Sequence, residues 1–441
     1  MPMIAAASRP LPRSAQLGML WLAAFLCQLP LVLNPGYYSH DELQWAAYAH
    51  DGLQVPWWDF GVFQYRPLTF DIWMALSRAL FDTPMLFHAL VVAWGAANAA
   101  LLFSVGRGFG LRTWPAALGA LGFALSPYAV TVHGWVGCIA DLIWLGCGLI
   151  MVLLLQRTRH WAIAALLAAV LTVAALLGKE AAFALPPLLA LAWWFDARRP
   201  VWLAAILASG GVCALYLGVR LDVLLHAPRE GAHYTLALAN VPVRWLEYQL
   251  FPPVVPLQET FLVLRRVVPA AIAGALWLGL LAALWQANRR IAVLFMLGGL
   301  AALLPVLPLA GSWNHYAYGL AAMGAMCIAA AWPRASRRGR GFIGAFVALT
   351  LLHGGAAMGR MHEVGRIQSA FSPALAQVLR DAPGGVALRL HPEAKDGVFV
   401  RLTHAIPHYR GVPVDGRVRI VSHDAPADYE VQPDGRLRPL R

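Results

Sequence analysis

Apolar runs of about 17–22 residues recur along this 441-residue chain, and each is long enough to cross a membrane as a helix. The hydrocarbon core offers no water to backbone groups, so such runs fold as helices that satisfy their own hydrogen bonds. Only 13% of the residues are charged, whereas a soluble domain is about 25% charged. The sequence therefore predicts an all-α polytopic transmembrane bundle of about eleven spans, at 16–34, 84–106, 114–131, 136–155, 161–177, 181–195, 201–219, 268–287, 291–309, 315–332 and 341–358.

The placement of arginine predicts the orientation of this bundle. Arginine-rich short loops alternate with arginine-poor ones, and the positive-inside rule puts the rich loops, with Arg9, Arg13 and the N-terminus, in the cytoplasm. Much of the +12 net charge falls in these loops, so it does not indicate a nucleic-acid-binding protein. Lysine occurs only at Lys179 and Lys395. Together with the bias toward Ala and Leu, this favours a GC-rich bacterial source and a multi-pass protein of the bacterial inner (cytoplasmic) membrane.

The apolar range 161–195 is too long to cross the membrane as one continuous helix. As one helix it would be about 52 Å long, against a hydrocarbon core of about 30 Å. Arginines on both flanks also require an even number of crossings. A tight hairpin that turns at Gly178, Lys179 and Glu180 satisfies both constraints and places this polar turn at the external face.

The remaining segments define the predicted domain organisation. Residues 1–358 form the transmembrane domain, with external loops at 35–83 and 220–267 that bear interfacial amphipathic helices. The polar tail, 359–441, follows an odd number of crossings and is predicted to be extracytoplasmic. Its segments RVRIV and YEVQ have the pattern of strands between Gly and Pro, which predicts a small α/β unit.

Unusual ionisable residues collect on the predicted external side. A carboxylate there can act as general base toward an acceptor, and neighbouring cations can stabilise a phosphate leaving group. A divalent metal beside the acidic pair is an open alternative, although no ligand spacing requires one. The candidates are Asp41, Glu42, Arg66, His133, Asp141, Lys179, Glu180, Arg220 and His315.

Each candidate also has a structural interpretation. The acidic pair can begin an interfacial helix, and Lys179 with Glu180 can form an ordinary polar turn. Asp141 can pair with a neighbouring helix, and the two histidines can be turn residues. Arg66 can anchor a helix at the headgroups, and Arg220 can extend from a helix end to the interface.

Several segments, in order, resemble the GT-C superfamily of multi-spanning glycosyltransferases. They are similar to its members of the protein O-mannosyltransferase and aminoarabinose transferase type. The matching segments are SHDELQW (39–45), YRPLTF (65–70), LFDTPMLFHAL (80–90), HGWVGCIADLIWLGCGL (133–149), LLGKEAAFALPPLL (176–189), LGVRLDVLL (217–225), VRWLEYQLFPPVVPL (243–257) and NHYAYGLAAMG (314–324). The last of these usually begins with Arg-Tyr in the family, and here has His315 and Tyr316.

This resemblance implies a function. Asp41 would be the catalytic general base, supported by Glu42, in an inverting transfer of sugar from a polyprenyl-phosphate-linked donor to an extracytoplasmic glycan, lipid or protein acceptor. The donor phosphate would be held by Lys179, Arg220, Arg66 and His315. Supporting residues would be Glu180, Asp141, His133 and Tyr316.

Two other classes of protein stay open. One is a transporter or flippase of a lipid-linked sugar, for which charges at the membrane midplane and inverted repeats are typical. The charges here lie at one predicted face, and no internal repeat is clear. The other is a non-catalytic membrane assembly protein of the cell envelope.

Overall fold

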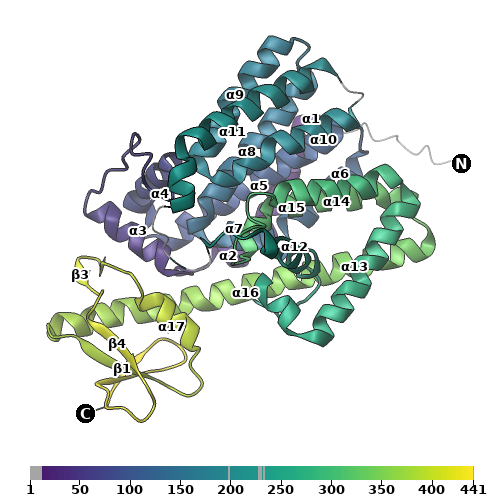
Figure 1. The fold of residues 1–441 in the computed structure, drawn as a ribbon. Coiled ribbons are helices and arrows are strands. Elements are labelled where there is room, and N and C mark those ends of the chain that lie inside the picture. The colour runs from purple at the N-terminus through teal and green to yellow at the C-terminus, as the bar shows by residue number, and fades with distance from the viewer. Residues whose placement is uncertain (1–11, 197–198, 227–230, 232–233, 441) are drawn as a thin grey trace, which may run out of the picture.

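The computed structural model describes residues 12–196, 199–226, 231 and 234–440, and it is predominantly a bundle of helices (Figure 1). Arg9, which helps to orient the N-terminus above, lies outside these residues, as does part of the loop 220–267. Six helices in the described part are long and apolar enough to cross a membrane: α5 (Pro84–Gly108), η1 with α8 (Val136–Arg157), α9 (Trp161–Gly178), α11 (Pro200–His226), α13 (Val267–Ala287) and α16 (Arg337–Asp381).

A seventh crossing can be built from two helices. α6 (Thr113–Ala124) and α7 (Pro127–Gly134) meet at an angle of 58° and together have the length and apolar character of a span. The bend lies at Ser126, whose hydroxyl accepts the N–H of Ala129 and caps α7. Pro127 follows at the first helical position, where its missing N–H costs no hydrogen bond.

The other four predicted spans contain shorter helices, so a helical bundle with several apolar helices of membrane length is confirmed and the count of eleven is not. Proline accounts for two of them, because Pro30 follows α1 and Pro305 follows α14, and proline cannot continue a helical hydrogen-bond ladder. These shorter elements are α1 (Arg13–Leu26) with α2 (Leu29–Val32), η2 (Glu180–Ala184) with α10 (Leu185–Phe195), α14 (Arg289–Leu303) and α15 (Tyr318–Ala331).

The segments between these helices form short helices of their own. Residues 35–83 fold as α3 (His40–His50) and α4 (Pro67–Leu80), which pack against each other. α11 continues through Arg220 to His226, so the predicted start of the second loop lies inside a helix. The remaining connecting elements are η4 (Leu238–Asn240), α12 (Val241–Leu250), η5 (Thr260–Arg265), η6 (Asn314–Ala317) and η7 (Trp332–Arg334).

The last helix extends far beyond its apolar part. α16 has 45 residues and runs from the bundle to the C-terminal unit (Figure 1). Its second half is amphipathic, and it buries Ile367, Phe371 and Leu375 at helical spacing. This apolar stripe explains why the helix continues past the boundary expected at 358.

The chain ends in the small α/β unit that the sequence predicts. Its sheet has the strand order β4-β1-β5-β6, with β1 parallel to β4 and β5, and with β6 antiparallel to β5. Phe399 is buried against Phe371 of α16, so the unit shares its core with that helix. The elements are β1 (Val386–Leu390), α17 (Asp396–Thr403), β2 (His408–Tyr409), β3 (Val412–Pro413), β4 (Val418–Val421), β5 (Tyr429–Val431) and β6 (Leu437–Pro439).

The C-terminal unit contacts the segment 35–83. The His408 side chain bonds Asp51 at 2.9 Å, and Arg410 pairs with Asp82 at 2.5 Å. The ring of His404 lies 5.6 Å from the ring of His40, and His40 directly precedes Asp41 in the sequence. The tail and the acidic pair are therefore on the same side of the bundle.

Two adjacent glycines of α16 offer a matched test of this packing. A Cβ added at Gly354 would overlap the carbonyl oxygen of Leu125 at the bend between α6 and α7, whereas a Cβ at Gly355 meets nothing within 4 Å. We expect Gly354→Ala to lower the free energy of unfolding by about 1–3 kcal/mol because a crowded core resists extra volume. Gly355→Ala should leave it unchanged or slightly higher. Equal thermal midpoints for the two purified variants would contradict this close crossing.

Candidate functional site

The acidic pair lies at the start of α3, where local geometry separates its two carboxylates. Ser39 is the N-cap, and Glu42 completes a capping box with it. The Asp41 side chain is 30% exposed, and it contacts Ser39 and His40 at 3.2 and 3.3 Å. Glu42 is only 2% exposed. Asp41 is thus the accessible carboxylate of the pair.

Glu42 connects the first loop to the start of α8. Its carboxylate accepts the backbone N–H groups of Tyr38, Ser39 and Val136 at 2.6, 2.8 and 2.9 Å. Burial outweighs these three donors, and it raises the pKa of Glu42 to about 8. At neutral pH the fold therefore favours the protonated form of Glu42.

This raised pKa predicts a pH dependence of stability. A carboxyl group with a folded-state pKa above its ordinary value of 4.5 contributes stability that is complete below pH 4.5 and lost as pH rises through about 8. Thermal midpoints of the purified protein should therefore decrease between pH 5 and pH 8.5. Glu42→Gln, which cannot titrate, should lack this part of the slope. Parallel slopes for the two proteins would show that Glu42 does not titrate in this range.

Two further charge pairs lie at the same end of the bundle. Lys179, held in extended backbone between α9 and η2, pairs with Asp141 of α8 at 2.6 Å, and both side chains are buried. Arg66, which precedes α4, pairs with Glu180 at 2.8 Å. The break in the helix falls at the predicted hairpin, and each of its two ionic residues has a partner from another segment.

His315 and Tyr316 adjoin these pairs from η6. The Lys179 ammonium lies 5.1 Å from the centre of the Tyr316 ring. The His315 ring packs against Trp135 and Tyr316, and it lies within electrostatic range of Lys179 and Arg66. The structure therefore brings eight predicted residues to one region, which we call the acid–base cluster: Asp41, Glu42, Arg66, Asp141, Lys179, Glu180, His315 and Tyr316.

A buried thiol links the two halves of the acid–base cluster. Cys138, in η1, lies within electrostatic range of Asp41 and Glu42 on one side and of Asp141 and Lys179 on the other. Cys138 therefore lies between the start of α3 and the pair of Asp141 and Lys179.

The other two predicted site residues make their hydrogen bonds outside the acid–base cluster. Arg220 is fully buried, donates to the carbonyl oxygens of Val62 and Phe63 at 2.7 and 2.9 Å, and lies over the Tyr65 ring. It therefore fixes the loop before α4. His133 is also fully buried, and its ring nitrogens contact Gln28 and the Tyr318 hydroxyl at 2.7 and 2.8 Å. Neither side chain contacts a carboxylate of the acid–base cluster through a hydrogen bond in the described part of the chain.

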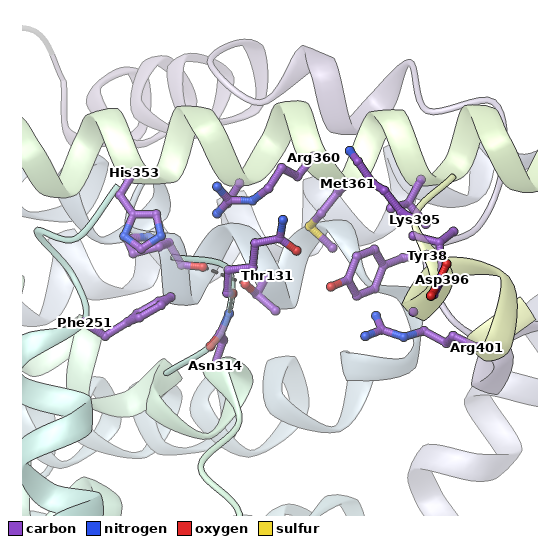
Figure 2. A pocket seen from close by; sticks show the side chains of 16 residues that line it. Tyr38, Thr131, Phe251, Asn314, His353, Arg360, Met361, Lys395, Asp396 and Arg401 are labelled. Atoms are coloured by element: carbon purple, nitrogen blue, oxygen red, sulfur yellow. Dashed lines mark hydrogen bonds between the residues drawn. The ribbon is translucent and has the colours of Figure 1, made fainter. Parts of the chain in front are cut away.

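A cavity of about 270 Å³ adjoins the acid–base cluster and involves residues that sequence reasoning missed. It lies between α7, the loop after α12, α16 and α17, and Figure 2 shows Arg360 and Arg401 extending toward it from the last two. Arg360 had a signal, because it is the first charged residue after a charge-free run in α16. No signal in the sequence indicated Arg401, because the position of this residue depends on how the C-terminal tail packs against the bundle.

No family model matches this chain, and a search of curated proteins finds no match either. Among the described residues, no group of three or more His, Cys, Asp or Glu is arranged to hold a metal ion. The site offers an accessible carboxylate near one buried and one partly buried ion pair, together with a cavity lined by two arginines. Such a set can accept a proton and stabilise developing negative charge.

Proposed function

We propose that this chain is a membrane glycosyltransferase that transfers a sugar from a polyprenyl-phosphate-linked donor to an acceptor outside the cytoplasm. Asp41 is the general base in this proposal. The observation that carries it is the pairing of one accessible carboxylate with one buried acid at the start of α3, near cations from three other segments, Arg66, Lys179 and Arg401. The order of the motifs that resemble the GT-C superfamily supports the same reaction.

In the proposed reaction, Asp41 accepts the proton of the acceptor hydroxyl or amine as that group attacks the anomeric carbon. The bond between this carbon and the donor phosphate breaks, and the phosphate leaves with the electron pair. Lys179 and Arg66 are already paired with carboxylates. In this proposal the two cations hold the site in place and stabilise the negative charge that develops on the leaving phosphate. Other residues also contact the phosphate directly.

Membrane reconstitution tests this proposal. Purified protein in liposomes is mixed with a polyprenyl-phosphate donor carrying a radiolabelled sugar and with envelope glycans and glycolipids as acceptors. Transfer of label with inversion at the anomeric carbon supports the proposal. Movement of the intact donor across the bilayer without any transfer of label would instead indicate a flippase. If neither transfer nor movement is detected with donors that carry several different sugars, the result would favour an assembly protein.

A further inference from the structure

The cavity beneath the C-terminal unit contains two arginines that lack a carboxylate partner. Among the described residues, no ion pair within 4.0 Å involves Arg360 or Arg401, whereas Lys395 at the same cavity pairs with Glu363 at 2.8 Å. Arg360 donates to the carbonyl oxygens of Val255 and Leu257 at 3.4 and 3.2 Å. These bonds use two of the five N–H donors of its guanidinium and fix its position.

The second arginine comes from the tail. Arg401, on α17, lies over the Tyr38 ring at 5.1 Å, and Figure 2 shows this ring reaching into the same space as Arg360. The lining includes three cations, Arg360, Lys395 and Arg401, but one carboxylate, Asp396. Burial raises the pKa of Glu259 to about 7, so a large fraction of this carboxyl is protonated at neutral pH. The cavity therefore carries a surplus of positive charge.

The rest of the lining is mixed, with polar side chains such as Thr131, Gln258 and Asn314 and with an apolar part. Phe251, Ala357, Met361 and Val398 contribute hydrocarbon and aromatic surface to the cavity. The charge-free run of α16 ends at Gly359, directly before Arg360. A cavity with arginines where the apolar run ends matches a ligand with a phosphate at the headgroup level and a hydrocarbon chain. A soluble anion would not use the apolar wall.

This cavity is close to the carboxylate of the proposed transferase site. Tyr38 lines the cavity, and its backbone N–H bonds Glu42 at 2.6 Å. Arg401 lies within electrostatic range of Asp41. A phosphate bound between the two arginines would therefore lie next to the accessible carboxylate rather than in a separate part of the molecule.

We propose that this cavity binds the phosphate of a lipid-linked ligand, with Arg360 from the bundle and Arg401 from the tail as its direct contacts. The tail is thus part of the binding site. The anion site rests on geometry, and the choice of polyprenyl phosphate as its ligand rests on the proposed function. Removing both arginines should weaken binding at least tenfold, because the phosphate loses its charge-assisted hydrogen bonds.

The test measures binding to the full-length protein in nanodiscs by native mass spectrometry. The probes are a polyprenyl monophosphate, the polyprenol of equal chain length and inorganic phosphate. The proteins are wild type, Arg360→Gln/Arg401→Gln, Arg401→Lys and the control Arg419→Gln, whose side chain is exposed on β4 of the same tail. Thermal midpoints confirm that each variant is folded.

The inference predicts that the monophosphate binds wild type and Arg419→Gln alike, and that the double variant loses at least tenfold in affinity. Arg401→Lys should retain part of the binding because it keeps the charge. The inference is overturned if the polyprenol binds as tightly as the monophosphate, if inorganic phosphate binds equally well, or if the double variant binds like wild type. Label transfer is measured in parallel. Binding without transfer by wild type would reject the proposed function alone, and transfer with unaltered binding by the double variant would reject this inference alone.

Discussion

Replacing Asp41 with Asn is expected to lower the rate of sugar transfer by about 10²–10⁴-fold, the usual contribution of a general base. The amide is nearly isosteric but cannot accept the proton of the acceptor. Asp41 is partly exposed, and its side-chain hydrogen bond and ion pair in the described part of the chain are with Ser39 and His40, so its replacement should change the thermal midpoint little. Transfer by the purified variant in liposomes, at matched protein concentration, measures the effect.

The matched control is Asp59→Asn. Asp59 is an exposed carboxylate of the same segment, and it accepts the backbone N–H of Gly61 at 3.0 Å. Its loss removes the same charge from the same side of the bundle without touching α3. We expect transfer close to that of wild type. Equal losses in the two variants would indicate an effect of net charge, and retained transfer in Asp41→Asn would remove Asp41 from the mechanism.

The largest expected effect on stability comes from the pair of Lys179 and Asp141. Lys179→Met leaves the Asp141 carboxylate buried without its cation, and breaking such a pair from one side typically costs about 3–5 kcal/mol. The thermal midpoint of the purified protein should fall strongly, and the yield of folded protein should fall with it. Unfolding followed by intrinsic tryptophan fluorescence in detergent measures this loss.

Two controls separate this loss from a general effect of removing lysine. Lys179→Met/Asp141→Leu removes both charges and should be more stable than the single variant, because no unpaired charge stays buried. Lys395→Met breaks the exposed pair with Glu363 and should cost no more than about 1 kcal/mol. A Lys179→Met protein as stable as Lys395→Met would show that the pair is hydrated in the native protein.

The sequence allowed the main architecture to be predicted because hydrophobic length is a local property. The helices lie where the apolar runs lie, and the break at Gly178 follows from the excess length of 161–195. The strands β4 and β5 coincide with RVRIV and YEVQ, because the strand pattern of these segments is also a local property. The number of long spans was less predictable. The bend at Ser126 and the shortened helices depend on packing and on the positions of prolines. The length of an apolar run does not report either of these.

The partners of the charged residues could not be predicted. Nothing in the sequence indicates that Arg220 would bind the carbonyl groups of Val62 and Phe63, far away along the chain. The pairing of Lys179 with Asp141 requires α8 and α9 to be in register. The contribution of Arg401 depends on α16 carrying the tail back to α3, a tertiary contact without a local pattern.

The most direct test of the central claim compares the envelope glycans and glycolipids of three strains by mass spectrometry. A deletion strain is complemented with wild type, with Asp41→Asn or with an empty vector, and protein levels are matched. The account predicts that the same sugar is absent in the deletion and in the Asp41→Asn strain and is restored by wild type. Restoration by Asp41→Asn would contradict it, because a protein that works without this carboxylate does not use it as the base for sugar transfer.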